Sequence, residues 1–112
     1  MSTTTVPLGR VASARSGDKG ADANIGLWTD DERVFEVLRE QVTPARVEAH
    51  FRALCRGGVE RHELPNLKAL NFLLHDALDG GGAASLRTDA QGKTLSLGLL
   101  QMTVEVPTEL LG

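Results

Sequence analysis

The chain has 112 residues, enough for one domain with a modest hydrophobic core and too few for two. Hydrophobic residues make up 41% of the chain and charged residues 24%, which is typical of an ordinary soluble globular protein. A net charge of −3 and an aromatic content of 4% argue against nucleic-acid partners, which require basic surfaces or exposed aromatic platforms.

A single cysteine, Cys55, excludes an internal disulfide and a cysteine-paired zinc site. The first residues lack the basic end and apolar core of a signal peptide. No apolar run approaches the roughly 20 residues that cross a membrane. We therefore expect a cytoplasmic protein with no metal site, no cofactor, and no nucleic-acid or membrane partner.

The first quarter of the chain predicts a disordered end followed by two strands. Residues 1–5 are polar and are expected to be disordered, so that residues 6–112 form the single domain. Residues 6–14 and 24–29 predict strands. Residues 15–26 concentrate glycines and charges of both signs, and they predict a long loop that closes a wide hairpin.

Two helices are predicted next. Asp30 or Asp31 provides the N-cap of the first, and Thr43 followed by Pro44 begins the second, which Gly57 ends together with the next glycine. One stripe of the first helix contains Val34, Val37, Leu38 and Gln41, and Val47, Phe51 and Leu54 follow at helical spacing in the second.

The second half predicts a strand, a long helix and a short strand. Residues 59–64 are rich in charge and predict an edge strand. Residues 65–78 form the clearest helical pattern, which a run of three glycines at 80–82 ends, and residues 85–88 predict a short strand. The arc of the predicted helix contains Leu67, Leu70, Leu74, Ala77 and Leu78.

The last segment has two readings by pattern alone. Leu95, Leu97 and Leu99 alternate as in a strand, whereas Leu95, Leu99 and Met102 are spaced as in a helix. Residues 103–106 predict a strand in either case.

Three ordered blocks of sequence resemble a known family. The blocks are Ser16–Gly20 with Ala23–Gly26, then Glu63–Phe72 with Gly80–Gly82, then Ser85–Lys93. They resemble the small ferredoxin-fold domain of the acyclic terpene utilisation (AtuA-like) proteins, which also occurs as a free-standing chain.

The resemblance implies an α+β fold, a two-layer sandwich with a mixed β-sheet and helices packed on one face (ferredoxin-like). It also favours a helix over residues 89–100. Larger relatives belong to a bacterial catabolic pathway with acyl-CoA intermediates, which implies a metabolic context and a larger AtuA-like partner. The pattern of the family has an acidic residue directly after Gly20, whereas here Ala21 precedes Asp22.

The segment 15–26 is the main concentration of chemistry in the chain. Its glycines free the backbone N–H groups to converge, and Lys19 and Arg15 add positive charge, which together suit a phosphate or a carboxylate. Asn71 borders an apolar stripe and needs a partner, either backbone or a ligand or loop residue. The candidate ligand-binding residues are Arg15, Ser16, Gly17, Asp18, Lys19, Gly20, Asn24 and Asn71.

His75 is expected to be a surface residue of a helix, on the same flank as Asn71. Three functions follow from these features. The first is an accessory module that binds an anionic metabolite, an acyl-CoA or an organic acid, beside a larger AtuA-like partner. The second is an enzyme acting on an acyl-CoA-type substrate with Asp18 and Lys19 as catalytic groups. The third is a structural assembly domain, for example in a homo-oligomer.

Overall fold

A computed structural model describes residues 2–19, 22–51, 57–75 and 93–111. The described strands are β1 (Thr3–Pro7), β2 (Ser13–Lys19), β3 (Asp22–Trp28), β4 (Val59–Leu64), β5 (Ala69–Leu74) and β6 (Thr103–Pro107). The described helices are α1 (Glu32–Gln41), α2 (Pro44–His50) and α4 (Lys93–Leu99), with 3-10 turns η1 (Leu8–Arg10), η2 (Pro65–Leu67) and η4 (Thr108–Leu111). None of the helices in the described part of the chain is long and apolar enough to cross a membrane.

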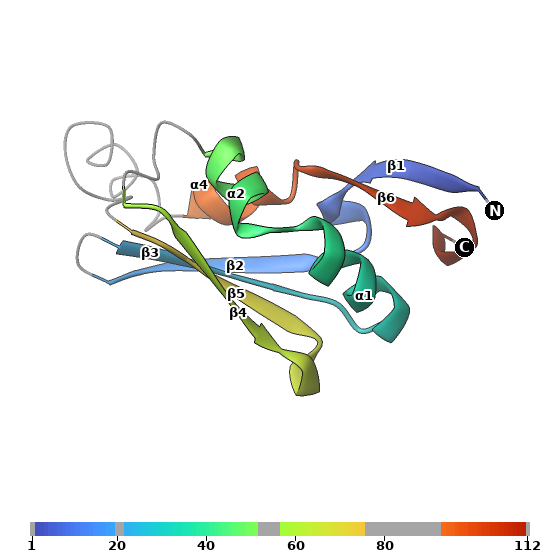
Figure 1. The fold of residues 1–112 in the computed structure, drawn as a ribbon, viewed down its shortest axis with the longest axis horizontal. Helices are drawn as coiled ribbons and strands as arrows, with labels where there is room; N and C mark the ends of the chain where they lie inside the picture. Colours follow the sequence, from blue (N-terminus) through green and yellow to red (C-terminus); the bar gives the residue numbers. More distant parts are fainter. Residues whose placement is uncertain (1, 20–21, 52–56, 76–92, 112) are drawn as a thin grey trace.

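The strands form two sheets with helices on one side. Four strands make a sheet in the order β2-β3-β5-β4, and β1 pairs with β6 in a separate ribbon. Helices α1, α2 and α4 lie on the same face of the larger sheet (Figure 1). The α+β class with helices on one face is confirmed. The sheet is not mixed, because every described pairing is antiparallel, the hairpins β2–β3 and β4–β5 being joined through β3 and β5.

The N-terminal segment differs from the sequence expectation in two ways. Thr3–Pro7 forms strand β1 and pairs with β6, where a disordered end was expected. The single strand predicted over residues 6–14 is instead interrupted by η1, in which Leu8 is fully buried and its N–H donates to the carbonyl of Met102 at 2.8 Å. The η1 turn, fixed by the buried Leu8, connects β1 of the two-stranded sheet to β2 of the four-stranded sheet.

The segment predicted as a long loop is a regular hairpin. Strands β2 and β3 are in register from Ser13 opposite Trp28 to Lys19 opposite Asp22, so only residues 20 and 21 lie between them. The prediction of a loop over residues 15–26 is therefore wrong, while the strand predicted at 24–29 is confirmed as β3. Since β3 is an interior strand, its N–H groups serve the ladders to β2 and β5 and do not line a cradle.

Local capping signals place the starts of both predicted helices correctly, although α2 ends at His50 and not at the glycine predicted to end it, Gly57. The Asp31 carboxylate accepts from the N–H of Arg33 at 2.8 Å and caps α1. The Thr43 hydroxyl accepts from the N–H of Arg46 at 3.2 Å, and Pro44 occupies the first turn of α2. The buried residues of these helices are Val34, Phe35, Val37, Leu38 and Val47.

The helix predicted over residues 65–78 is wrong for its described part. Pro65–Leu67 forms a single 3-10 turn, Lys68 adopts a left-handed conformation with φ of 51°, and Ala69–Leu74 is strand β5. Alternate residues Leu70, Phe72 and Leu74 are fully buried, whereas Leu67 is 68% exposed. The two-residue period fits the sheet, because β5 lies between β3 and β4.

The remaining predictions fall on the C-terminal part. The helix reading of the last segment is confirmed for residues 93–99, and the strand predicted at 103–106 is β6. The edge strand predicted at 59–64 is β4. Leu54, Ala77, Leu78, the glycines at 80–82 and the strand predicted at 85–88 lie outside the described residues, as does a helix start at Asp89.

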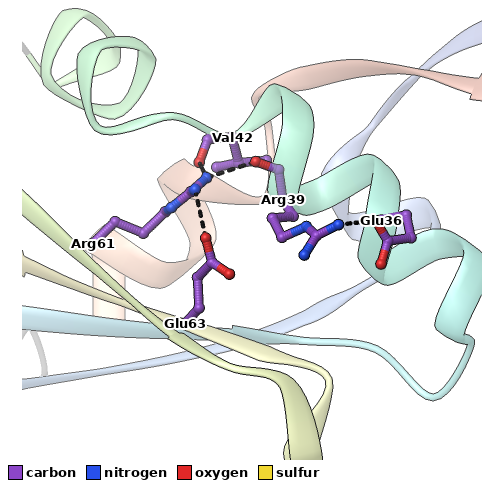
Figure 2. Close-up of polar contacts among 5 residues, drawn as sticks. All are labelled: Glu36, Arg39, Val42, Arg61 and Glu63. Atoms are coloured by element: carbon purple, nitrogen blue, oxygen red, sulfur yellow. Dashed lines mark hydrogen bonds and ion pairs between the residues drawn. The ribbon is translucent and has the colours of Figure 1, made fainter.

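Arg61 joins the edge strand to the end of α1 (Figure 2). Its side chain points to the helix layer and is 16% exposed. Its guanidinium donates to the carbonyls of Arg39 at 2.7 Å and Val42 at 3.0 Å, and to the Glu63 carboxylate at 3.1 Å. These bonds satisfy carbonyl groups at the C-terminal end of the helix.

Candidate functional site

The larger sheet has a second face that no described helix covers, which we call the open face. Along each strand the side chains alternate between the helix layer and this face. Its residues are Ser13, Arg15 and Gly17 of β2, Asp22, Asn24, Gly26 and Trp28 of β3, Glu60, His62 and Leu64 of β4, and Ala69, Asn71, Leu73 and His75 of β5 and its end.

One row of the open face, running across the strands, contains a cation, a glycine without a side chain and an amide. Arg15 lies opposite Gly26, Gly26 opposite Asn71, and Asn71 opposite His62. Arg15 and His62 are exposed. Among the described residues, a methyl group at Gly26 would meet only the carbonyl of Arg15, at 3.9 Å, so no described side chain fills the space above this glycine. The row therefore has a floor without a side chain, bordered by polar groups.

An asparagine pair lies next to this floor. The Asn24 amide donates to the Asn71 amide oxygen at 3.4 Å. Gly17 makes room for the pair, because a methyl group there would lie 3.0 Å from the Asn24 side-chain oxygen. Of the two partners expected for Asn71, backbone or a ligand or loop residue, the structure supplies Asn24 from the predicted binding segment. Each amide keeps donor capacity for a further partner.

The predicted ligand-binding residues divide into three groups. Arg15, Gly17, Asn24 and Asn71 share the open face. Ser16 lies opposite the buried Ile25 and faces the helix layer instead. Asp18 and Lys19 belong to β2 by their backbone, but their side chains lie outside the described residues, as does Gly20.

A second polar group lies at one end of the open face. The His75 ring nitrogens contact the Glu60 carboxylate at 2.9 Å and the Asp22 carboxylate at 3.3 Å, so residues of three strands meet; we call them the His75 cluster. The expectation of a helical surface histidine is wrong. His75 and Asn71 nevertheless lie on the same face, as expected, because two residues four positions apart share one face of a strand as well as one flank of a helix.

The His75 cluster favours a charged ring. A neutral imidazole donates one hydrogen bond, whereas both ring nitrogens of His75 face carboxylate oxygens. The bond to Glu60, followed by that to Asp22, raises the pKa of His75 above its ordinary value of 6.5. A raised pKa in the folded state gives stability that is complete below the pKa of the unfolded state and is lost as the pH rises through the folded value.

We expect the stability difference between the wild type and His75→Gln to depend on pH. It should be largest at pH values below the ordinary pKa of 6.5 and shrink as the pH rises above it, because the charged ring loses its proton at its raised pKa. Urea unfolding at several pH values measures it. His62→Gln is the matched control, since His62 is an exposed neighbour on the same face. A difference that stays constant across these pH values would contradict the role of the ion pairs.

A hollow of about 410 Å³ lies beyond the Trp28 end of the open face. It is bordered by the start of β2, the end of β3, the first turn of α1 and Leu110 of η4. Its lining includes Arg10 together with Asp30 and Asp31, whose two carboxylates disfavour an anion there, and Asp31 already caps the helix. No group of His, Cys, Asp and Glu within the described residues is arranged to hold a metal ion.

The family of the chain follows from its similarity to known proteins. No curated protein and no solved structure shows a significant similarity to the chain. The family model of the AtuA ferredoxin-like domain matches residues 6–105, which contain all four strands of the larger sheet. The chain belongs to the AtuA ferredoxin-like domain family.

Proposed function

We propose that the protein is a small accessory module that binds an anionic metabolite on the open face of its sheet. The observation that carries the proposal is the row of Arg15, Gly26 and Asn71 across three adjacent strands. Adjacent strands lie about 4.8 Å apart, so the guanidinium and the amide border a gap of roughly 10 Å. A carboxylate or phosphate group fits this gap above Gly26.

The side chains on either side of Gly26 suit one anionic head group. A guanidinium binds a carboxylate or phosphate through two parallel hydrogen bonds, and the amides of Asn24 and Asn71 add neutral donors. The carboxylates of Asp22 and Glu60 disfavour extra negative charge at the cluster end. In the opposite direction, Trp28, Ala69 and Leu64 form the next apolar row and offer contact to an acyl chain.

An organic acid or an acyl-CoA therefore remains the proposed ligand, in a bacterial catabolic pathway and in the cytoplasm. The larger AtuA-like partner is part of the same proposal and rests on the family alone. Catalysis by Asp18 and Lys19 on an acyl-CoA-type substrate stays a prediction, because their side chains lie outside the described residues.

The test is titration of the protein with a branched short-chain carboxylate, acetyl-CoA and free CoA. We expect at least one probe to bind and Arg15→Ala to weaken it about ten- to a hundredfold, the effect of losing charge-assisted hydrogen bonds. Isothermal titration calorimetry on dilute protein measures both affinities. Arg10→Ala is the matched control, since Arg10 is an exposed arginine that borders the hollow.

Two results would count against the proposal. Binding of none of the three probes to the wild type would remove it. Loss of binding in Arg10→Ala with full binding in Arg15→Ala would move the ligand site from the open face to the hollow.

A further inference from the structure

The residues of the open face are complementary to a second copy of the same face. The register of β2, β3, β5 and β4 fixes the neighbours of each side chain on this face. Two sheets that pack face to face keep their strands within about 30° of each other. A two-fold axis parallel to the strands then places β2 against β4 of the second copy, and β3 against β5.

Under this symmetry, large residues meet small ones near the axis. Trp28 lies opposite Ala69 of the second copy, because the two share a transverse row. Asn71 lies opposite Gly26 in the same way. The 37%-exposed side chain of Trp28 therefore faces the small Ala69, and Asn71 faces the space above Gly26. A symmetric interface repeats each contact twice.

Groups of opposite charge also come near each other across the axis. Arg15 on one edge strand lies over β4 of the second copy, opposite His62 and one row from Glu60. Asp22 lies opposite His75 of the second copy at the end of the face. Long side chains tolerate the offset that sheet twist introduces, and Arg15 is exposed. No row of the described open face brings two carboxylates together under this symmetry, and the residue directly opposite Arg15 is a histidine.

We propose that two copies of the chain form a symmetric dimer through their open faces, in which Arg15 pairs with Glu60 of the second copy and Trp28 covers Ala69. The dimer goes beyond the proposed ligand binding and does not depend on it. The two are linked, because Asn71 of the second copy occupies the space above Gly26 in which the anion is proposed to lie. An anion and a second copy therefore compete for the open face.

Sedimentation velocity of the ligand-free full chain tests the dimer. We expect the mass to rise from one to two chains with concentration, and Arg15→Glu or Glu60→Arg to weaken the dimer at least tenfold. The double variant Arg15→Glu with Glu60→Arg is expected to regain dimer, because the pair is restored with its signs exchanged. Ala69→Arg places bulk against Trp28 without touching the helix layer, and it should also give monomers.

The control is Glu48→Arg, the same charge change on an exposed position of α2, which should leave the dimer intact. Circular dichroism establishes that each variant is folded, and Ala69→Arg serves if Glu60→Arg unfolds through loss of its bond to His75. A wild type that stays monomeric at high concentration overturns the proposal. So does a dimer that survives both Arg15→Glu and Ala69→Arg, or single charge variants that the double variant does not rescue. The probe titrations use dilute protein, and the sedimentation experiment contains no ligand. Failure of the dimer proposal can therefore be distinguished from failure of the proposed ligand binding.

Discussion

Replacing Phe72 with alanine is expected to lower the free energy of unfolding by about 3–5 kcal/mol, the usual cost of removing a buried aromatic ring. Phe72 is fully buried in β5, between β3 and β4, and its side chain points to the helix layer. Strand β5 itself is paired on both sides, so its backbone cannot shift easily into the space that the ring leaves. Chemical denaturation followed by circular dichroism measures the change.

Leu67→Ala is the matched control and should change stability by less than about 0.5 kcal/mol, because Leu67 is 68% exposed. The pair distinguishes the two readings of this segment. In a helix over residues 65–78, Leu67 would belong to the buried arc and Phe72 would lie off it. A larger loss for Leu67→Ala than for Phe72→Ala would therefore contradict strand β5.

The comparison of these readings shows which parts of the fold are predictable from the sequence. The starts of α1 and α2 depend on contacts within four residues, such as Asp31 with Arg33 and Thr43 with Arg46, so local patterns identify them. The state of β5 depends on β3 and β4, which are distant in sequence. Leu70 and Leu74 fit a helix and a strand equally well, and only the sheet decides between them.

In the candidate site, too, some features can be predicted from local sequence and others depend on distant strands. The sequence alone is enough to select Arg15, Asn24 and Asn71 as candidate site residues, because their residue types stand out in their segments. The loop prediction nevertheless failed, because glycines and charges obscured the alternation of Ala23, Ile25 and Leu27, all buried in β3. The His75 cluster was not predicted, since it requires the register of three strands. The family, in contrast, was predicted from three short blocks of sequence and is confirmed over residues 6–105.

Replacing Arg61 with alanine is expected to cost about 2–3 kcal/mol, through loss of the charged donor that α1 uses at its C-terminal end. The guanidinium contacts the carbonyls of Arg39 and Val42 and is 16% exposed, and Val42, which carries one of the two acceptors, is fully buried (Figure 2). Hydrogen bonds from charged groups contribute about 1.5–3 kcal/mol, and buried acceptors left without a donor cost a similar amount. Arg61→Lys, which keeps the charge but not the fork of donors, should lie between wild type and alanine.

Arg39→Ala provides the control for this prediction, because it removes a guanidinium from the same helix end. The Arg39 side chain is 43% exposed and pairs with Glu36 at the surface, an interaction worth roughly 0.3–0.5 kcal/mol between helix neighbours. The carbonyl of Arg39 that receives Arg61 is backbone and remains in the variant. Equal losses in Arg61→Ala and Arg39→Ala by denaturation would mean that surface charge alone matters. The larger loss for Arg61 is expected, since Arg61 joins edge strand β4 to the helix layer and so fixes one border of the open face.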